Sequence, residues 1–315
     1  MVKCLICGKE FENGFGPEIC PECLGDVQPA SSQPASSQPA IPEEYKAHYS
    51  GTFGECDYDT RMFREVKGFS LSKNITFLCY NHNCGLQPYI PEGYNSCYGM
   101  FKSCRLPEGF SLGDNFDTSH VTNMYGMFMF CVLPKGFSLG KNFDTSHVTD
   151  MGNMFQKCSL PEGFSLGDKF DTSNVTNMSY MFCGSTIPEG FSLGNKFDTS
   201  SVKDMANMFE ECSLPKGFTL GDKFDTSSVG EMSAMFSYCE LPEGFTLGDK
   251  FDTSNVTSMC DMFSRCVLPE GFTLGEKFNT SPNAYSFNMF DKCILPRGID
   301  NLESVDTIIR KLKYK

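Results

Sequence analysis

A period of 27 residues constrains this chain more than any other feature of its sequence. Each unit begins with a Leu-Pro or Ile-Pro step, and no insertion breaks the register. The steps begin at Leu106, Leu133, Leu160, Ile187, Leu214, Leu241, Leu268 and Leu295. Units of this length stack on copies of themselves, because only a neighbour of the same shape buries what each unit leaves exposed. The sequence predicts a repeat solenoid of about eight units, mainly β with short helical turns.

The apolar positions of one unit predict how its chain is wound. Counted from the Leu of the Leu-Pro step as position 1, positions 5 and 7 are apolar, as in Phe164 and Leu166, and this alternation predicts a short strand. Position 8 is always glycine, which suits a turn with positive φ. The spacing of Val175, Met178 and Met181 predicts a second short strand that runs into a tight helical turn.

Composition and the repeat together divide the chain into five parts. Residues 1–26 are a candidate zinc ribbon, residues 27–42 form a Pro- and Ser-rich flexible linker, and residues 43–105 hold an N-terminal cap with degenerate repeats. The solenoid spans residues 106–298, and residues 299–315 are a C-terminal capping helix. This helix is predicted from the spacing of Leu302, Val305, Ile309 and Leu312 behind the candidate N-caps Asp300 and Ser304.

The strongest local motif is a C-x2-C-x12-C-x2-C arrangement made by Cys4, Cys7, Cys20 and Cys23. Each cysteine pair can wrap one side of a tetrahedral ion, and one structural Zn²⁺ suits four thiolates. So short a segment with few apolar residues needs the metal in order to fold. The pattern resembles the zinc-ribbon family, with rubredoxin-like iron as a minor alternative. A second cluster, Cys79, His82 and Cys84, is a weaker metal candidate because it lacks a fourth ligand.

Charge and cysteine usage limit the partners and the compartment. The net charge of −13 disfavours nucleic acid and anionic membranes, since binding to phosphates depends on clustered Lys and Arg. No apolar run is long enough for a transmembrane segment, and the first residues lack the apolar core of a secretory signal. The 17 cysteines are odd in number, and the repeat places most of them. We therefore expect a reducing, cytoplasmic location.

Three columns of identical residues run through the repeats. Position 26 is Cys in most units and Ser185 in one. This favours a buried small side chain at position 26 over a row of bound metal ions or a row of disulfide bonds between units. Position 12 is Asp, with Asn279 last, and the Thr-Ser that follows favours an Asx turn over a calcium site. The Thr and Ser columns at positions 13 and 14 suggest ice or carbohydrate binding as an alternative, but turn chemistry explains them better.

Enzyme function is not expected. The chain has four histidines, and His120 and His147 merely share one repeat position. No Ser-His-Asp set, phosphate-binding loop or isolated carboxylate pair stands out from the repeat background.

The run FDTSNVTNMSYMF, residues 170–182, with the cysteine that ends each unit resembles the repeat of BspA-like leucine-rich-repeat proteins. The resemblance covers residues 90–298 through the pattern FDTSxVTxMxxMFxxC. It implies a right-handed leucine-rich-repeat-like solenoid and, commonly, a role in contact or adhesion for bacterial surface or secreted proteins. The zinc ribbon in front and the lack of a recognisable signal depart from that pattern.

Variation between units indicates where a partner binds. Positions 15, 17, 18, 20, 21, 24, 25 and 27 differ freely, and we call their side chains the variable ridge, whereas position 6 is only Ser or Thr. The candidate partner-binding residues on the ridge are Tyr125, Phe130, Tyr180 and Tyr238. The sequence thus predicts a non-enzymatic scaffold that binds a protein. The alternative is a surface or secreted adhesin that recognises a host protein or glycan.

Overall fold

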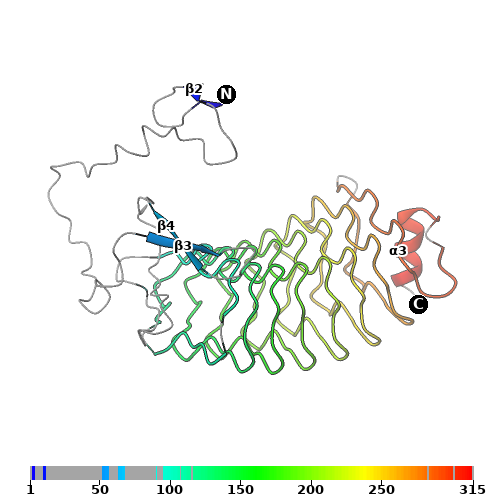
Figure 1. The fold of residues 1–315 in the computed structure, drawn as a ribbon. Helices are drawn as coiled ribbons and strands as arrows, with labels where there is room; N and C mark the ends of the chain where they lie inside the picture. Colours follow the sequence, from blue (N-terminus) through cyan, green and yellow to red (C-terminus); the bar gives the residue numbers. More distant parts are fainter. Residues whose placement is uncertain are drawn as a thin grey trace.

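The computed structural model describes residue 90 and residues 95–106, 108–114, 116–281, 284–300 and 302–313, and the backbone of four short strands before them. From residue 95 onward the chain forms coils that stack side by side along one axis (Figure 1). We call this array the coil stack. Each coil takes 27 residues, because the residues that pair across neighbouring coils are 27 apart.

The assigned strands are short and lie before the coil stack in the sequence. Strand β1 (Val2–Lys3) pairs antiparallel with β2 (Glu10–Phe11). Strand β3 (Thr52–Cys56) pairs antiparallel with β4 (Phe63–Lys67), with Thr52 opposite Lys67. Within the described coils, pairing is reduced to isolated parallel bridges at positions 18 and 27, such as Asn123 with Asp150 and Val132 with Ser159.

The strand expected at positions 5 to 7 is not formed in the described coils. The stretch 137–139, for example, makes no bridge, although Phe137 and Leu139 are buried as the apolar pattern predicts. The Phe137 N–H instead closes a turn by donating to the Pro134 carbonyl at 3.0 Å. Positive φ at Gly136 and Gly140, 75° and 83°, bends the chain on both sides before a ladder can extend.

The tight helical turn expected after position 19 is instead a run of turns bonded to the next coil. The Met127 N–H donates to the Met124 carbonyl at 3.1 Å, whereas the Gly126 and Phe128 N–H groups each donate to the next coil at 2.8 Å. Positions 21 and 25 have positive φ throughout, as at Gly126 (62°) and Phe130 (60°). This left-handed geometry directs alternate N–H groups along the stack axis.

Phenylalanine columns fill the core of the coil stack. The rings at position 23 stack face to face with centroids 5.2–5.7 Å apart from Phe101 to Phe290. Rings at position 5 meet this column edge-on, as Phe218 meets Phe209 at 5.9 Å. A third column runs through position 11, where Phe143 and Phe170 stack at 6.4 Å. Burial of these rings, together with the buried Leu, Met and Val side chains, stabilises the stack.

The threonine column at position 13 is also internal. Thr199 is fully buried, and its hydroxyl donates to the Asp225 carbonyl and accepts from the Asp225 N–H, both at 2.8 Å. The same side chain therefore replaces a backbone bridge at this corner of the coil. The threonines from Thr118 to Thr253 are buried and so cannot contact ice or carbohydrate. Turn and inter-coil bonding explains the column.

Helix α3 (Val305–Lys313) packs on the C-terminal end of the coil stack (Figure 1). Its residues Ile308, Ile309 and Leu312 are buried, and the Leu312 carbonyl accepts a hydrogen bond from the Leu274 N–H at 3.2 Å. The Ser304 hydroxyl accepts from the Thr307 N–H, as an N-cap does. Leu302, which the sequence placed on the apolar face, precedes the helix and is 90% exposed.

Removing residues 300–315 should cause the chain to aggregate. The deletion uncovers the apolar surface beneath Ile308, Ile309 and Leu312, and terminal repeats need such a cover for solubility. Light scattering against time at constant temperature measures the effect. The exposed-site variant Leu302→Ser is the matched control and should behave like the wild type. A soluble, monomeric truncated chain would contradict this expectation.

Candidate interaction surface

The candidate zinc ligands Cys4, Cys7, Cys20 and Cys23 lie outside the described residues, as does the weaker cluster Cys79, His82 and Cys84. Antiparallel pairing of β1 with β2 brings together the chain on the two sides of the Cys4–Cys7 pair. In the part of the chain that the structure describes, no group of three or more His, Cys, Asp or Glu residues is arranged to hold a metal ion.

The cysteine column is buried and reduced. Cys212 and Cys239 are free thiols inside the core, and their Sγ atoms donate to the carbonyls of Phe182 and Phe209, respectively. Burial raises the pKa of Cys212 to about 12, which suppresses the reactive thiolate. In the unit that begins at Leu160, Ser185 replaces the cysteine at position 26, and its hydroxyl donates to the Phe155 carbonyl. The prediction of a buried small side chain at position 26 is confirmed.

The aspartate column forms Asx turns, as the sequence predicts. The Asp117 carboxylate accepts the Ser119 N–H at 2.9 Å, and this bond lowers the pKa of Asp117. Burial raises the pKa of Asp171, but hydrogen bonds from Ser173 and the charges of nearby lysines bring it below its usual range. Equivalent bonds from position 14 to position 12 recur along the stack, at Asp144, Asp198, Asp225 and Asp252.

The variable ridge carries exposed aromatic side chains at positions 21 and 25. Tyr180 is 36% exposed at position 21, and Tyr238 is 52% exposed at position 25. Both have positive φ, 58°, so their side chains leave a left-handed backbone. The Tyr238 ring lies 5.2 Å from the guanidinium of Arg265, which occupies the same position in the next coil. The sequence prediction included position 25 in the ridge but did not name Arg265 as a candidate binding residue, and this cation–π pair adds it.

Tyr125 and Phe130 are half-buried and less accessible than the other two candidates. The Tyr125 ring stacks on Tyr98, with centroids 5.2 Å apart and planes at 5°. Burial raises the pKa of Tyr125, with smaller contributions from Tyr98 and Asp150. Its other neighbour is Gly152, where an added Cβ would lie 3.0 Å from the ring. The sequence prediction did not name Tyr98. The 27-residue register could have identified it as the neighbour of Tyr125, because both residues are at position 20.

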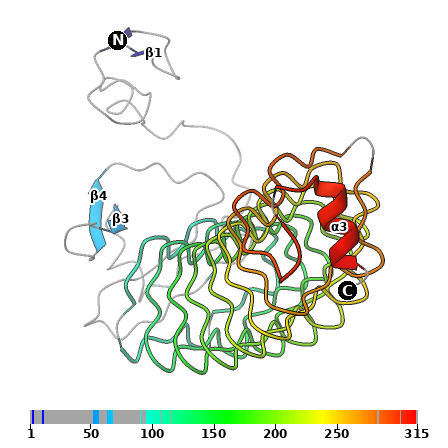
Figure 2. The ribbon, with the colours of Figure 1, turned by 90° about the vertical axis from the view of Figure 1, so that its right-hand side faces the viewer.

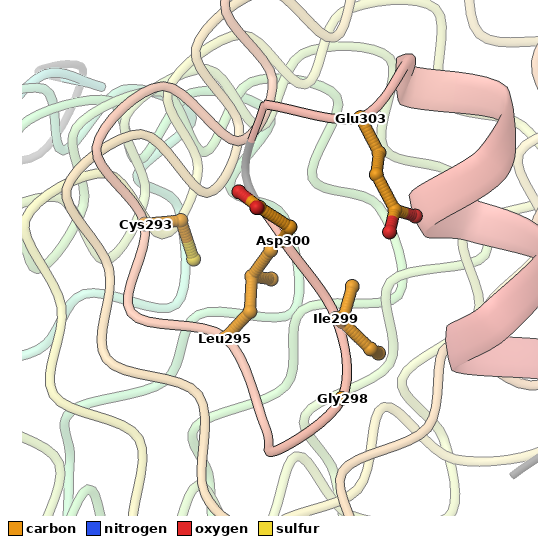
Figure 3. A pocket seen from close by; sticks show the side chains of 6 residues that line it. All are labelled: Cys293, Leu295, Gly298, Ile299, Asp300 and Glu303. Atoms are coloured by element: carbon orange, nitrogen blue, oxygen red, sulfur yellow. The ribbon is translucent and has the colours of Figure 1, made fainter.

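A cavity of about 380 Å³ lies at the C-terminal end of the coil stack (Figure 3). It is lined by Cys293, Leu295, Gly298, Ile299, Asp300 and Glu303. Burial raises the pKa of Cys293 to about 12, and Glu303 forms an ion pair with Lys311 of α3. The cavity therefore combines a neutral thiol and apolar side chains with two carboxylates: Glu303 is paired with Lys311, and Asp300 accepts the Leu302 N–H at 2.9 Å. We assign no chemistry to it.

Comparison with known proteins identifies the repeat. Four overlapping segments, residues 95–214, 134–243, 163–266 and 218–295, match the model of the family described as Mycoplasma protein of unknown function, DUF285. The chain belongs to this family. DUF285 is the BspA-like repeat family, so the resemblance of the repeat is confirmed, whereas the family match does not include the cysteine-rich N-terminus. No curated protein and no solved structure matches the chain significantly.

Proposed function

We propose that this DUF285 protein is a non-enzymatic scaffold that binds a protein partner through the variable ridge of its coil stack. We further propose a right-handed, leucine-rich-repeat-like coil, as the family resemblance implies. The observation that supports the scaffold function is the contrast between two surfaces of the same coil. Exposed side chains at position 6, such as Ser165 and Ser192, are uniformly small, whereas the ridge presents Tyr180, Tyr238 and Arg265. Aromatic and arginine side chains dominate the energetics of protein interfaces.

Charge on the ridge restricts the partner further. Glu210 and Glu231 lie at positions 24 and 18 of neighbouring coils, and Glu211, next to Glu210, already forms an ion pair with Lys157 at 3.6 Å. Asp204, also at position 18, is half-buried, and its pKa is raised by burial and by the charges of Glu231 and Asp150. A partner that approaches this part of the ridge with basic side chains would relieve the repulsion. We therefore propose a partner with a basic contact surface.

The double variant Tyr180→Ala with Tyr238→Ala should weaken partner binding by about tenfold or more, because truncating interface aromatics commonly removes over 1 kcal/mol. The partner is first identified by photo-crosslinking from position 238 in extract of the source cell. Its affinity is then measured by calorimetry. The matched control is Ser165→Ala with Ser192→Ala on the exposed position-6 surface. Loss of affinity in the control pair alone would place the site on that surface and disprove the ridge as the site.

We propose one structural zinc ion held by Cys4, Cys7, Cys20 and Cys23 in a ribbon tethered to the coil stack. Support comes from the four-thiolate spacing and from the β1–β2 pairing that flanks the first cysteine pair. Elemental analysis should find one zinc per chain, and Cys20→Ser should release it while the melting of the coil stack stays unchanged. Cys212→Ser, in the buried column, is the control and should retain the metal. Full zinc in Cys20→Ser would refute the assignment.

We propose a cytoplasmic location, supported by the buried thiols of Cys212 and Cys239, which donate to backbone carbonyls. No helix in the described part of the chain is long and apolar enough to cross a membrane. The alternative function, a surface adhesin for a host protein or glycan, draws support from the BspA-like repeat. Fractionation of the source cell, with protease treatment of intact cells, separates the two: an adhesin is cleaved and a cytoplasmic scaffold is protected.

A further inference from the structure

Backbone hydrogen bonds run in one direction along the side of the coil stack that holds positions 18 to 25. Each inner coil donates N–H groups from positions 19, 21, 23 and 25 to carbonyls of the following coil. Met259 donates to the Tyr285 carbonyl at 2.8 Å, and Asp261 donates to the Phe287 carbonyl at 2.9 Å. The last coil, which holds residues 285–294 on this side, therefore needs another acceptor for its four equivalent N–H groups.

These donors are unpaired in the last coil. The N–H groups of Ser286, Asn288, Phe290 and Lys292 donate to no described residue, and we call them the open N–H row. Phe290 is only 3% exposed. A buried N–H group without a partner is rare in folded proteins. The row therefore indicates an acceptor that the described part of the chain does not supply.

Helix α3 leaves the open N–H row uncovered. Figure 2 looks onto this end of the stack and shows the helix along one side of it. That side holds positions 7 to 12, where the Leu274 N–H donates to the Leu312 carbonyl at 3.2 Å. The Lys313 ammonium group donates to the Asn279 side-chain oxygen there at 3.3 Å. The side with positions 18 to 25 thus stays accessible to a ligand.

Apolar side chains lie beside the open N–H row. The exposed ones are Tyr285 (63%), Phe287 (71%) and Ile294 (63%). At the same positions the preceding coil has the half-buried residues Ser258, Cys260 and Val267. The last coil is therefore both more apolar and more exposed at these positions. Exposed apolar side chains that gather in this way mark an interaction site.

The inner coils show which acceptor suits this backbone. In the coil of Ser233, the N–H group at position 20 donates to the side chain at position 18, from Ser233 to Glu231 Oε1 at 2.8 Å. The acceptor at position 18 is a carboxylate in three coils. In the last coil position 18 is Tyr285, and the Phe287 N–H donates to no described residue. A carboxylate from a ligand can take the place of the missing side chain.

A row that offers only donors selects a ligand that offers only acceptors. An ionised carboxylate accepts hydrogen bonds and donates none. The edge of an extended backbone fits less well, because it presents N–H groups as well as carbonyls. Asn288 and Lys292 have positive φ, 56° and 53°, as in the backbone concavities that bind anions through N–H groups. The geometry therefore favours carboxylates.

Side-chain charge at this end of the stack is compatible with an acidic ligand. Residues 285–313 contain five Lys or Arg and four Asp or Glu residues, whereas the whole chain has a net charge of −13. Lys292, the last residue of the row, is exposed, and its ammonium group lies 3.8 Å from the Asp291 carboxylate. An exposed pair of this kind is weak, so Lys292 can also attract a carboxylate of the ligand.

We propose that the C-terminal end of the coil stack binds an acidic peptide segment of a partner protein. Carboxylates of the segment accept from the open N–H row, and its apolar side chains cover Tyr285, Phe287 and Ile294. The site lies two coils beyond Tyr238. It selects the charge opposite to that of the basic partner proposed for the ridge, so each of the two proposals can fail without the other.

Fluorescence anisotropy tests the proposal with the full chain, loaded with zinc and kept in reductant. The probe is a fluorescein-labelled peptide of four Leu-Glu repeats, because alternate carboxylates match alternate donors. We expect saturable binding that weakens as the salt concentration rises. The same peptide with glutamine in place of every glutamate should bind about tenfold or more weakly, since it loses the charge-assisted hydrogen bonds.

Substitutions beside the row locate the site. Lys292→Glu and Phe287→Asp should each weaken binding of the Leu-Glu peptide by about tenfold or more, because each places a negative charge beside the carboxylates. The matched controls are Lys157→Glu, at position 25 of an inner coil, and Tyr98→Asp, at position 20 of the first described coil. Both should bind the peptide as the wild type does. All four residues are exposed, so thermal melting should stay unchanged.

Amide NMR spectra test the backbone donors themselves. The peptide should shift the amide proton signals of the open N–H row downfield, because each proton gains a hydrogen bond to a carboxylate. The equivalent signals of the preceding coil should move much less, since those N–H groups already donate to the last coil. They belong to Met259, Asp261, Phe263 and Arg265.

Inorganic phosphate separates a peptide site from a site for free anions. Phosphate should displace the Leu-Glu peptide only weakly, because it makes no contact with the apolar side chains. Four results would each overturn the proposal: no binding of the peptide, equal binding of its glutamine form, unchanged binding in Lys292→Glu and Phe287→Asp, or displacement by phosphate at the concentration of peptide that half-saturates the chain.

Discussion

Replacing Phe209 with alanine should lower the free energy of unfolding by about 3–5 kcal/mol. The Phe209 side chain is fully buried and stacks between Phe182 and Phe236, each with a centroid separation of 5.7 Å. Its edge also meets Phe218 at 5.9 Å. Urea unfolding followed by circular dichroism measures the loss.

The cavity left by this substitution cannot collapse easily, since backbone bonds fix the spacing of the coils. The Phe209 N–H donates to the Met235 carbonyl at 3.0 Å, and bonds of this kind recur on both sides. Phe287→Ala is the matched control, because the same residue type is 71% exposed there, and it should change stability by less than about 0.5 kcal/mol. Equal losses at the two positions would show that the ring column does not stabilise the stack.

Prediction from sequence succeeded where the repeat itself carries the information. Burial of the position-26 cysteines and the Asx turns of the aspartate column both follow from single residues that recur in register. Each of these features depends on local chemistry: a small apolar side chain, and a carboxylate two residues before an N–H. The 27-residue period then aligns the equivalent residues of successive coils in columns.

The turns at positions 21 and 25 could not be predicted in the same way. Their φ values are positive at Tyr180, Glu211 and Tyr238, residue types that rarely adopt this region. Left-handed geometry costs about 1–2 kcal/mol for such a residue. The stack offsets this through bonds between coils, such as that from the Glu211 N–H to the Ser237 carbonyl at 2.9 Å. Only the assembled neighbour supplies the acceptor, so one unit alone gives no signal.

The candidate site was predicted only in part for a related reason. Variation between units marked the ridge, but not which of its aromatics are exposed, because exposure depends on the side chain one coil away. Tyr125 is covered by Tyr98 on one side and rests against Gly152 on the other, whereas Tyr238 has only Arg265 over its ring. The exposure of Tyr285, Phe287 and Ile294 on the last coil was likewise not predictable, since the apolar pattern does not show which part of that coil α3 covers.

Thr199→Val should destabilise the coil stack by about 2–4 kcal/mol, although valine has nearly the same shape and is more apolar than threonine. The buried hydroxyl of Thr199 bonds to both the N–H and the carbonyl of Asp225, so its loss leaves two polar groups without partners. Thr199→Ser is the matched variant: it keeps both bonds, loses one methyl group, and should cost only about 1 kcal/mol. Urea unfolding of the three proteins measures the order. Valine at least as stable as serine would mean that packing of the methyl group, and not the hydroxyl bonds, holds this corner of each coil.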